Sequence, residues 1–129
     1  MRDDRTVVTP LAFDVAVERV KTLLKDEGFG VLCEIDVAAT LKQKLGETFR
    51  PYRILGACNP ALALRALSVE PRIGTLLPCN VVVEEREGET IVSAVDASAM
   101  LSVVDNAALV PIAAEVDERL GRVLEGTRS

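Results

Sequence analysis

Two cysteines, each followed directly by asparagine, are the residues in this sequence best suited to chemistry. Cys58-Asn59 and Cys79-Asn80 both fall where a segment of strand character meets a turn. If the two strands are neighbours, the thiols converge and could bind a soft metal ion or form a reversible disulfide. We therefore take these four residues as a candidate site for a small ligand or an ion.

A purely structural role is the alternative interpretation of the same four residues. Free cysteine is among the residue types most often buried, and asparagine commonly caps a helix or occupies a turn. The chain has no Cys-x-x-Cys motif, so the signature of thioredoxin-like proteins is missing. A tetrahedral zinc site would have to recruit Cys33, Glu34 or Asp36. Both interpretations stay open at this point.

Basic side chains suggest a second place for a ligand. Lys42, Arg50 and Arg53 could form an anion pocket near the helix expected to start at Asn59, because helix N-termini attract phosphates and carboxylates. The alternative is an ordinary solvated surface on which these side chains pair with acids. The candidate ligand-binding residues are thus Cys58, Asn59, Cys79, Asn80, Arg53 and Lys42.

Glu34 and Asp36 lie two residues apart, a spacing that could serve acid-base chemistry or a hard cation. The alternative is that Asp36 caps a helix and Glu34 faces solvent or an arginine. The chain has no histidine, which excludes a Ser-His-Asp or Cys-His nucleophile, and it lacks the phosphate-binding glycine motifs. Catalytic residues, a metal and a cofactor stay unassigned, and enzymatic activity stays an open question.

The composition indicates one small domain, over residues 1–129, with an aliphatic core. Hydrophobic residues make up 49% of the chain and aromatic residues only 3%, and the mean hydropathy is +0.25. A domain of this length buries about two thirds of the surface that its unfolded chain exposes. The apolar excess indicates surface that a second subunit covers, so we expect a homodimer.

Charge and thiol count indicate the compartment and the partners. Twenty acidic against fifteen basic residues give a net charge of -5, which opposes binding to a nucleic-acid backbone. Three cysteines, an odd number, indicate reduced thiols. Asp14 and Glu18 interrupt the apolar segment near the N-terminus, and no apolar run approaches the length of a membrane span. We expect a cytoplasmic protein without nucleic-acid or membrane partners.

Periodicity predicts about five strands and four helices. The expected strands are 5–9, 29–35, 52–58, 79–85 and 90–95, and the expected helices are 13–27, 37–45, 60–69 and 111–124. Gly28 and Gly46 follow two helix ends, and Asn59-Pro60 suits a helix start. Glu87-Gly88 suits the turn of a hairpin between the last two strands. We expect regular alternation along 29–35 and a loose turn from Asp96 through Met100.

Four motifs in this order resemble the uncharacterised bacterial and archaeal family known as domain of unknown function 302. The motifs are Glu34–Val37, Leu41–Gly46, Pro51–Pro60 and Leu77–Val83, and the resemblance covers nearly the whole chain. It implies an α+β fold, with a curved antiparallel sheet of about five strands and helices packed on it, like one repeat of the TATA-box-binding protein. The family carries no agreed activity, so the resemblance implies a fold without a function.

These observations lead to three functional hypotheses, of which one, a nucleic-acid binder, is suggested only by the fold analogy and is opposed by the acidic composition. The other two concern the cysteines. The first is a small homodimer that binds a small ligand or an ion beside the two Cys-Asn motifs. The second is a thiol-redox or metal-handling protein that uses Cys58 and Cys79, and it predicts a thiol that reacts quickly in the folded state.

Overall fold

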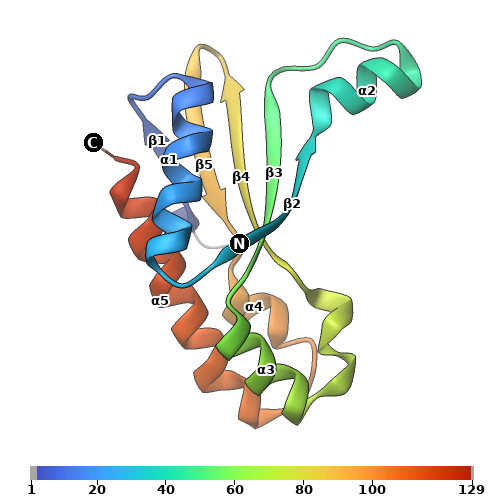
Figure 1. Ribbon diagram of the computed structural model, residues 1–129, viewed down its shortest axis with the longest axis vertical. Helices are drawn as coiled ribbons and strands as arrows, with labels where there is room; N and C mark the ends of the chain where they lie inside the picture. Colours follow the sequence, from blue (N-terminus) through green and yellow to red (C-terminus); the bar gives the residue numbers. More distant parts are fainter. Residues whose placement is uncertain (1–2, 129) are drawn as a thin grey trace.

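The computed structural model describes residues 3–128 and arranges them as an open antiparallel sheet with helices packed against it (Figure 1). The strands are β1 (Thr6–Thr9), β2 (Gly30–Asp36), β3 (Tyr52–Cys58), β4 (Cys79–Arg86) and β5 (Glu89–Ala94). The helices are α1 (Phe13–Asp26), α2 (Val37–Leu45), α3 (Pro60–Val69), α4 (Ala97–Leu101) and α5 (Val110–Gly126), with short 3-10 helices η1 (Asp3–Arg5), η2 (Pro71–Leu76) and η3 (Ala107–Leu109). The predicted α+β class is confirmed. Within residues 3–128, no helix has the length and apolarity that crossing a membrane requires.

The five strands lie in the order β1-β5-β4-β3-β2, and every neighbouring pair is antiparallel. β4 and β5 form the predicted hairpin, whose turn holds Glu87 at φ 55° and Gly88 at φ 80°. Two consecutive positive φ angles are typical of the turn whose twist matches that of the strands. The edge strand β2 is less regular than predicted, because its register shifts between Val31 and Cys33. The extra residue, Leu32, is 69% exposed.

The hydrophobic core lies on one face of the sheet, beneath α1 and α5. Alternate strand residues point to this face, among them Val7, Leu55, Val81 and Val92, which are almost fully buried. The helices contribute Val17, Val20 and Leu24 from α1 and Ile112, Val116, Leu120 and Val123 from α5. These helical positions are the ones that the 3.6-residue periodicity predicts.

α2 stands away from the rest of the molecule beyond one end of the sheet (Figure 1). Its ends are well formed, since the Asp36 carboxylate accepts a hydrogen bond from the Ala39 N–H at 2.9 Å and Gly46 ends the helix at φ 68°. The helix nevertheless has no buried residue, and Leu45 is 68% exposed. We call residues 30–51, which comprise β2, α2 and the loop to β3, the arm.

α4 replaces the loose turn that the sequence predicted after β5. The Asp96 carboxylate caps it by accepting a hydrogen bond from the Ala99 N–H at 3.0 Å. The Asp117 carboxylate, on α5, accepts hydrogen bonds from the N–H groups of Ala97 (2.7 Å) and Ser98 (3.0 Å). A helix of one to two turns is too short to persist alone, so its stability comes from this distant carboxylate. The prediction was wrong because the stabilising partner lies on another element.

Candidate functional site

The two cysteines of the Cys-Asn motifs line one small cavity at the end of the sheet nearest α3. Cys58 is the last residue of β3 and Cys79 the first of β4, and the register pairs Ala57 with Cys79. Cys58 is half-buried, whereas Cys79 is buried. The sequence analysis predicted that the two thiols converge if their strands are neighbours. β3 and β4 are neighbours, and both cysteines line the same cavity.

The cavity is narrow and apolar. Its volume is about 30 Å³, and its walls include Phe29, Leu62, Ala66, Ile73 and Ile112. This space suits a single water-sized group or an ion, because ligand pockets for metabolites are roughly 300 to 1,000 Å³. Cys58 and Cys79 both contribute to its wall.

Burial keeps the Cys79 thiol protonated at neutral pH. The pKa of Cys79 rises to about 11, chiefly because burial disfavours the thiolate and further because Cys58 and Asp117 add negative charge nearby. The neutral thiol is a poor nucleophile, since the thiolate is the reactive form. Cys79 is therefore a slow nucleophile in the folded protein, and a bound cation would have to displace its proton.

The two asparagines have separate surroundings. Asn59 is buried, and its Oδ1 accepts a hydrogen bond from the Leu62 N–H at 3.2 Å, while its Nδ2 donates to the Glu27 carbonyl at 3.4 Å. It caps α3, as the structural interpretation expected. Asn80 is exposed, and its carbonyl accepts a hydrogen bond from the Val95 N–H. Of the four motif residues, Cys58, Asn59 and Cys79 line the cavity and Asn80 does not.

Cys33 lies apart from this cavity, on the face of the sheet opposite the core. It is exposed, and its Sγ lies over Gly56, where an added Cβ would be 2.5 Å from that sulfur and 2.9 Å from Pro78 Cγ. Glycine at position 56 therefore makes room for both side chains. No group of three or more His, Cys, Asp or Glu side chains within residues 3–128 is placed to hold a metal ion. A tetrahedral zinc site that recruits Cys33 thus has no support.

The basic side chains of the suggested anion pocket do not meet. Arg53 points to the core face of the sheet and pairs with Glu34 and, at 3.6 Å, with Asp36. Arg50 pairs with Glu84 at 3.1 Å on the opposite face. Both arginines therefore follow the alternative interpretation, in which they pair with acids.

The predicted position of that pocket beside the start of α3 is also not found. Arg53 and Asn59 lie at opposite ends of β3, and a strand rises about 3.3 Å per residue, so roughly 20 Å separate them. Lys42 is exposed on α2, in the arm. The suggestion was wrong because the strand carries the helix start away from the basic residues.

Glu34 and Asp36 take structural roles at the base of the arm. Asp36 caps α2, and Glu34 accepts hydrogen bonds from Lys21, whose Nζ lies 2.6 Å from Oε1, and from Arg53. The bond from Lys21, followed by that from Arg53, lowers the pKa of Glu34 below its ordinary value. The pairing with Glu34 likewise raises the pKa of Lys21. A carboxylate held ionised by two cations is poorly suited to act as a general acid.

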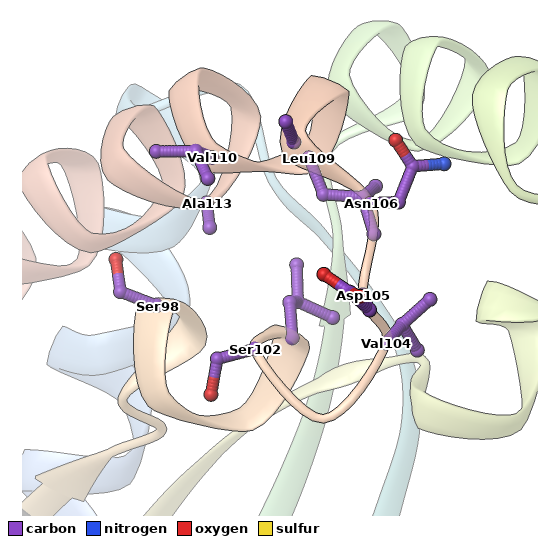
Figure 2. A pocket seen from close by; sticks show the side chains of 10 residues that line it. Ser98, Ser102, Val104, Asp105, Asn106, Leu109, Val110 and Ala113 are labelled. Carbon is purple, nitrogen blue, oxygen red and sulfur yellow. The ribbon is translucent and has the colours of Figure 1, made fainter.

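A larger pocket lies where the sequence suggested no site, between α4 and α5 (Figure 2). Its volume is about 370 Å³, and the segment from Ser98 to Ala113 lines it. The sequence features nearest to this pocket are Asp96 and Asn106, two residues that favour helix starts, each followed by a short apolar segment. They indicate where elements begin, but not that these elements enclose a space.

An open five-stranded antiparallel sheet, with two long helices on one face and a projecting arm, defines the class of protein. The family model described as "Domain of unknown function DUF302" matches residues 5–127, so the chain belongs to this family. The crystal structure of the uncharacterized conserved protein DUF302 from Bacillus stearothermophilus is similar, with a TM-score of 0.90 and 35% sequence identity over 95% of this chain and 96% of that chain. None of the curated proteins matches this chain. The likeness to a repeat of the TATA-box-binding protein stays a prediction.

Proposed function

We propose that this protein is a homodimer that binds a small soft ion in the cavity lined by Cys58 and Cys79. The observation that supports the proposal is that two cysteines from neighbouring strands line one small cavity with mainly apolar walls. Thiolate sulfur favours soft cations such as Cu(I), and apolar walls exclude the water that would compete for the ion. The size of the cavity favours an ion over a metabolite.

Asn59 supports this site indirectly. Because it caps α3 and bonds to the Glu27 carbonyl, it fixes the helix that forms one wall of the cavity. Asn80, Arg53 and Lys42 take no part, since their side chains do not line the cavity. The proposed ligands are therefore the two sulfur atoms alone.

A proton must leave Cys79 when the ion binds. Because the pKa of Cys79 is about 11, the affinity for Cu(I) should rise with pH throughout the neutral and mildly alkaline range. The thiol-redox alternative has less support, because it needs a thiolate that forms readily at neutral pH. If Cys79 is alkylated in the folded protein as quickly as in the unfolded chain, the thiol-redox hypothesis becomes the better supported of the two.

The test is an anaerobic titration with Cu(I) against a competing chelator. We expect one ion per chain in the wild type and in Cys33→Ser, and loss of high-affinity binding in Cys58→Ser and in Cys79→Ser. Circular dichroism establishes that the variants are folded. Equal binding by Cys58→Ser and the wild type, or an affinity independent of pH, would contradict the proposal.

The exposed edge of the sheet supports the homodimer. β2 is an edge strand whose side chains are nearly all exposed, with Leu32 at 69% and Ile35 at 44%. It contains neither lysine nor proline, the residues that commonly protect an edge from pairing. A second copy can add its own β2 antiparallel to this edge about a twofold axis, which also brings the apolar side of α2 near its counterpart.

Sedimentation at micromolar concentration tests the dimer. We expect the wild type to be a dimer and Leu32→Lys to be a monomer with an unchanged circular-dichroism spectrum, because an edge lysine opposes strand pairing. Val103→Lys is the matched control, since Val103 is 74% exposed and follows α4 in the chain, outside the arm. A monomeric wild type, or a dimer that survives Leu32→Lys, would overturn the dimer part alone and leave the metal site to its own test.

A further inference from the structure

The pocket between α4 and α5 is large enough for a small organic molecule. Its volume of about 370 Å³ falls at the lower end of the range of ligand pockets, roughly 300 to 1,000 Å³. One side is formed by α4, another by the first turns of α5, and the end by the loop that joins them (Figure 2).

This pocket is held in shape by hydrogen bonds that a ligand does not have to supply. The Asp117 carboxylate fixes the start of α4 through the N–H groups of Ala97 and Ser98. At the other side, the Asn106 side chain accepts a hydrogen bond from the Ala108 N–H at 3.0 Å and donates one to the Val69 carbonyl at 2.9 Å. Because the walls are ordered beforehand, binding does not incur the entropic cost of forming them.

The walls are mainly apolar, with one acidic side chain. Leu101, Val104, Leu109 and Ala113 provide apolar surface, and Leu101 lies between this pocket and the cysteine cavity. Asp105 is the acid in the lining, and Figure 2 shows its carboxylate turned toward the space between the two helices. Among residues 3–128, no basic side chain lines the pocket.

Two hydroxyl groups also line the pocket, those of Ser98 and Ser102. The Ser102 hydroxyl donates to the Ala99 carbonyl at 2.6 Å, which leaves its oxygen as an acceptor. Figure 2 shows the Ser98 hydroxyl on the opposite side of the pocket from Asp105. The pocket therefore offers a negative charge at one end, apolar walls and hydroxyl groups, and its lining includes no Lys or Arg from residues 3–128.

From this arrangement we infer that the pocket binds small amphipathic amines, with the ammonium group at Asp105 and the apolar body against Leu101, Leu109 and Ala113. A carboxylate paired with an ammonium group forms a charge-assisted hydrogen bond, and the apolar body removes aliphatic surface from water. An acid of the same shape would meet the Asp105 charge and be repelled. The inference does not depend on the cysteine cavity, and each can fail without the other.

Three probes of equal chain length separate charge from hydrophobicity: hexylammonium, 1-hexanol and hexanoate. Binding to the full chain is followed by two-dimensional NMR of the backbone amides. We expect hexylammonium to bind with a dissociation constant on the order of millimolar, with the largest shifts between Ser98 and Ala113, hexanol to bind more weakly and hexanoate not to bind. Equal binding of the three probes, no binding of hexylammonium, or shifts located elsewhere would overturn the inference.

Two pocket variants and one control variant test where the ligand binds. Asp105→Asn keeps the size of an exposed side chain and should weaken hexylammonium about tenfold while leaving hexanol unchanged. Glu47→Gln is the control and should change neither, because it removes the same charge from the arm, whose helix α2 lies at the opposite end of the molecule from α4 (Figure 1). Ala113→Leu fills part of the pocket and should weaken both probes. Unchanged hexylammonium binding in Asp105→Asn, or in folded Ala113→Leu, overturns the inference, and the first result stands even if the second variant does not fold.

Discussion

α2 and α4 have the same kind of N-terminal cap but differ in how far the rest of the molecule buries them. Asp36, at φ -87° and ψ 95°, caps α2 through the Ala39 N–H at 2.9 Å. Asp96, at φ -89° and ψ 92°, caps α4 through the Ala99 N–H at 3.0 Å. Yet α2 has no buried residue, whereas α4 buries Ala97 and Leu101. A cap thus decides where a helix begins, and the tertiary contacts decide what the helix contributes.

The difference comes from what lies behind each helix. α4 packs on α5, where the Asp117 carboxylate holds its first N–H groups and lies 3.8 Å from the buried Arg5 guanidinium. Arg5 in turn donates to the Asp117 and Val95 carbonyls, which joins the N-terminal segment to the end of β5. α2 has nine residues, fewer than an isolated helix needs to be stable in water. A second copy against the arm would supply the missing support.

Removing the Asp117 carboxylate should produce the largest effect, because it takes away the support that distinguishes α4 from α2. Asp117→Ala leaves two helix N–H groups and the buried Arg5 guanidinium without their carboxylate, and we expect a loss of about 3 to 5 kcal/mol in the free energy of unfolding. Urea denaturation measures it. Asp117→Asn keeps one acceptor oxygen and should lose less. An equal loss in both variants would show that the hydrogen bonds to α4 are not what matters.

The last leucine of each helix provides a matched pair. Leu101→Ala, at a position 5% exposed, should cost about 2 to 4 kcal/mol because it leaves a hole in the core. Leu45→Ala, at a position 68% exposed, should change the free energy of unfolding of the monomer by less than about 0.5 kcal/mol. Measurements at concentrations low enough to keep the chain monomeric make the comparison fair. A large loss in Leu45→Ala would mean that the arm packs on the body of the molecule.

Much of the fold could be predicted because its signals are local. Asn59-Pro60 starts α3, Gly28 and Gly46 lie at φ 84° and 68° after two helices, and the stripe through Val20 and Leu24 faces the core. Each of these depends on residues within one or two turns of one another. α4 and the irregularity in β2 were not predictable in this way, since they depend on Asp117 and on a change of register between two strands.

The candidate site was predictable only in part. Adjacent strands bring Cys58 and Cys79 to one cavity, and the repeated Cys-Asn pattern pointed to them. Alternation along β4 places Asn80 on the face opposite Cys79, so grouping Asn80 with the thiols overlooked a signal present in the sequence. Arg50 was grouped with Arg53 because it precedes β3, where no alternation fixes the direction of its side chain. It also gave no sign of the pocket beside α4, because that pocket exists only through the packing of α4 on α5.

Removing the two matched caps should have unequal effects. Asp96→Ala should lower the free energy of unfolding by about 1 to 2 kcal/mol, because α4 is part of the core and cannot fray without exposing Leu101. Asp36→Ala should cost less than about 1 kcal/mol, since α2 can fray alone and the loss cannot exceed the small stability of that helix. Hydrogen exchange should show faster amide exchange across α2 in Asp36→Ala and little change in the sheet. Equal losses would mean that α2 is already supported from outside, as in a dimer.

Acidification should weaken the ion pairs that hold the base of the arm to α1. The hydrogen bonds from Lys21 and Arg53 lower the pKa of Glu34, so the folded state binds a proton there less readily than the unfolded state. The stabilisation that this carboxylate provides is therefore complete above its ordinary pKa and is lost as the pH falls through the lowered value. The free energy of unfolding of the wild type should exceed that of Glu34→Gln at pH 7, and the small gap should close in acid. Glu47→Gln is the control, because Glu47 is exposed in the arm and no ion pair of Glu47 is found within residues 3–128. A gap that is the same at pH 7 and in acid would mean that the shape of the Glu34 side chain, and not its charge, holds the arm to α1.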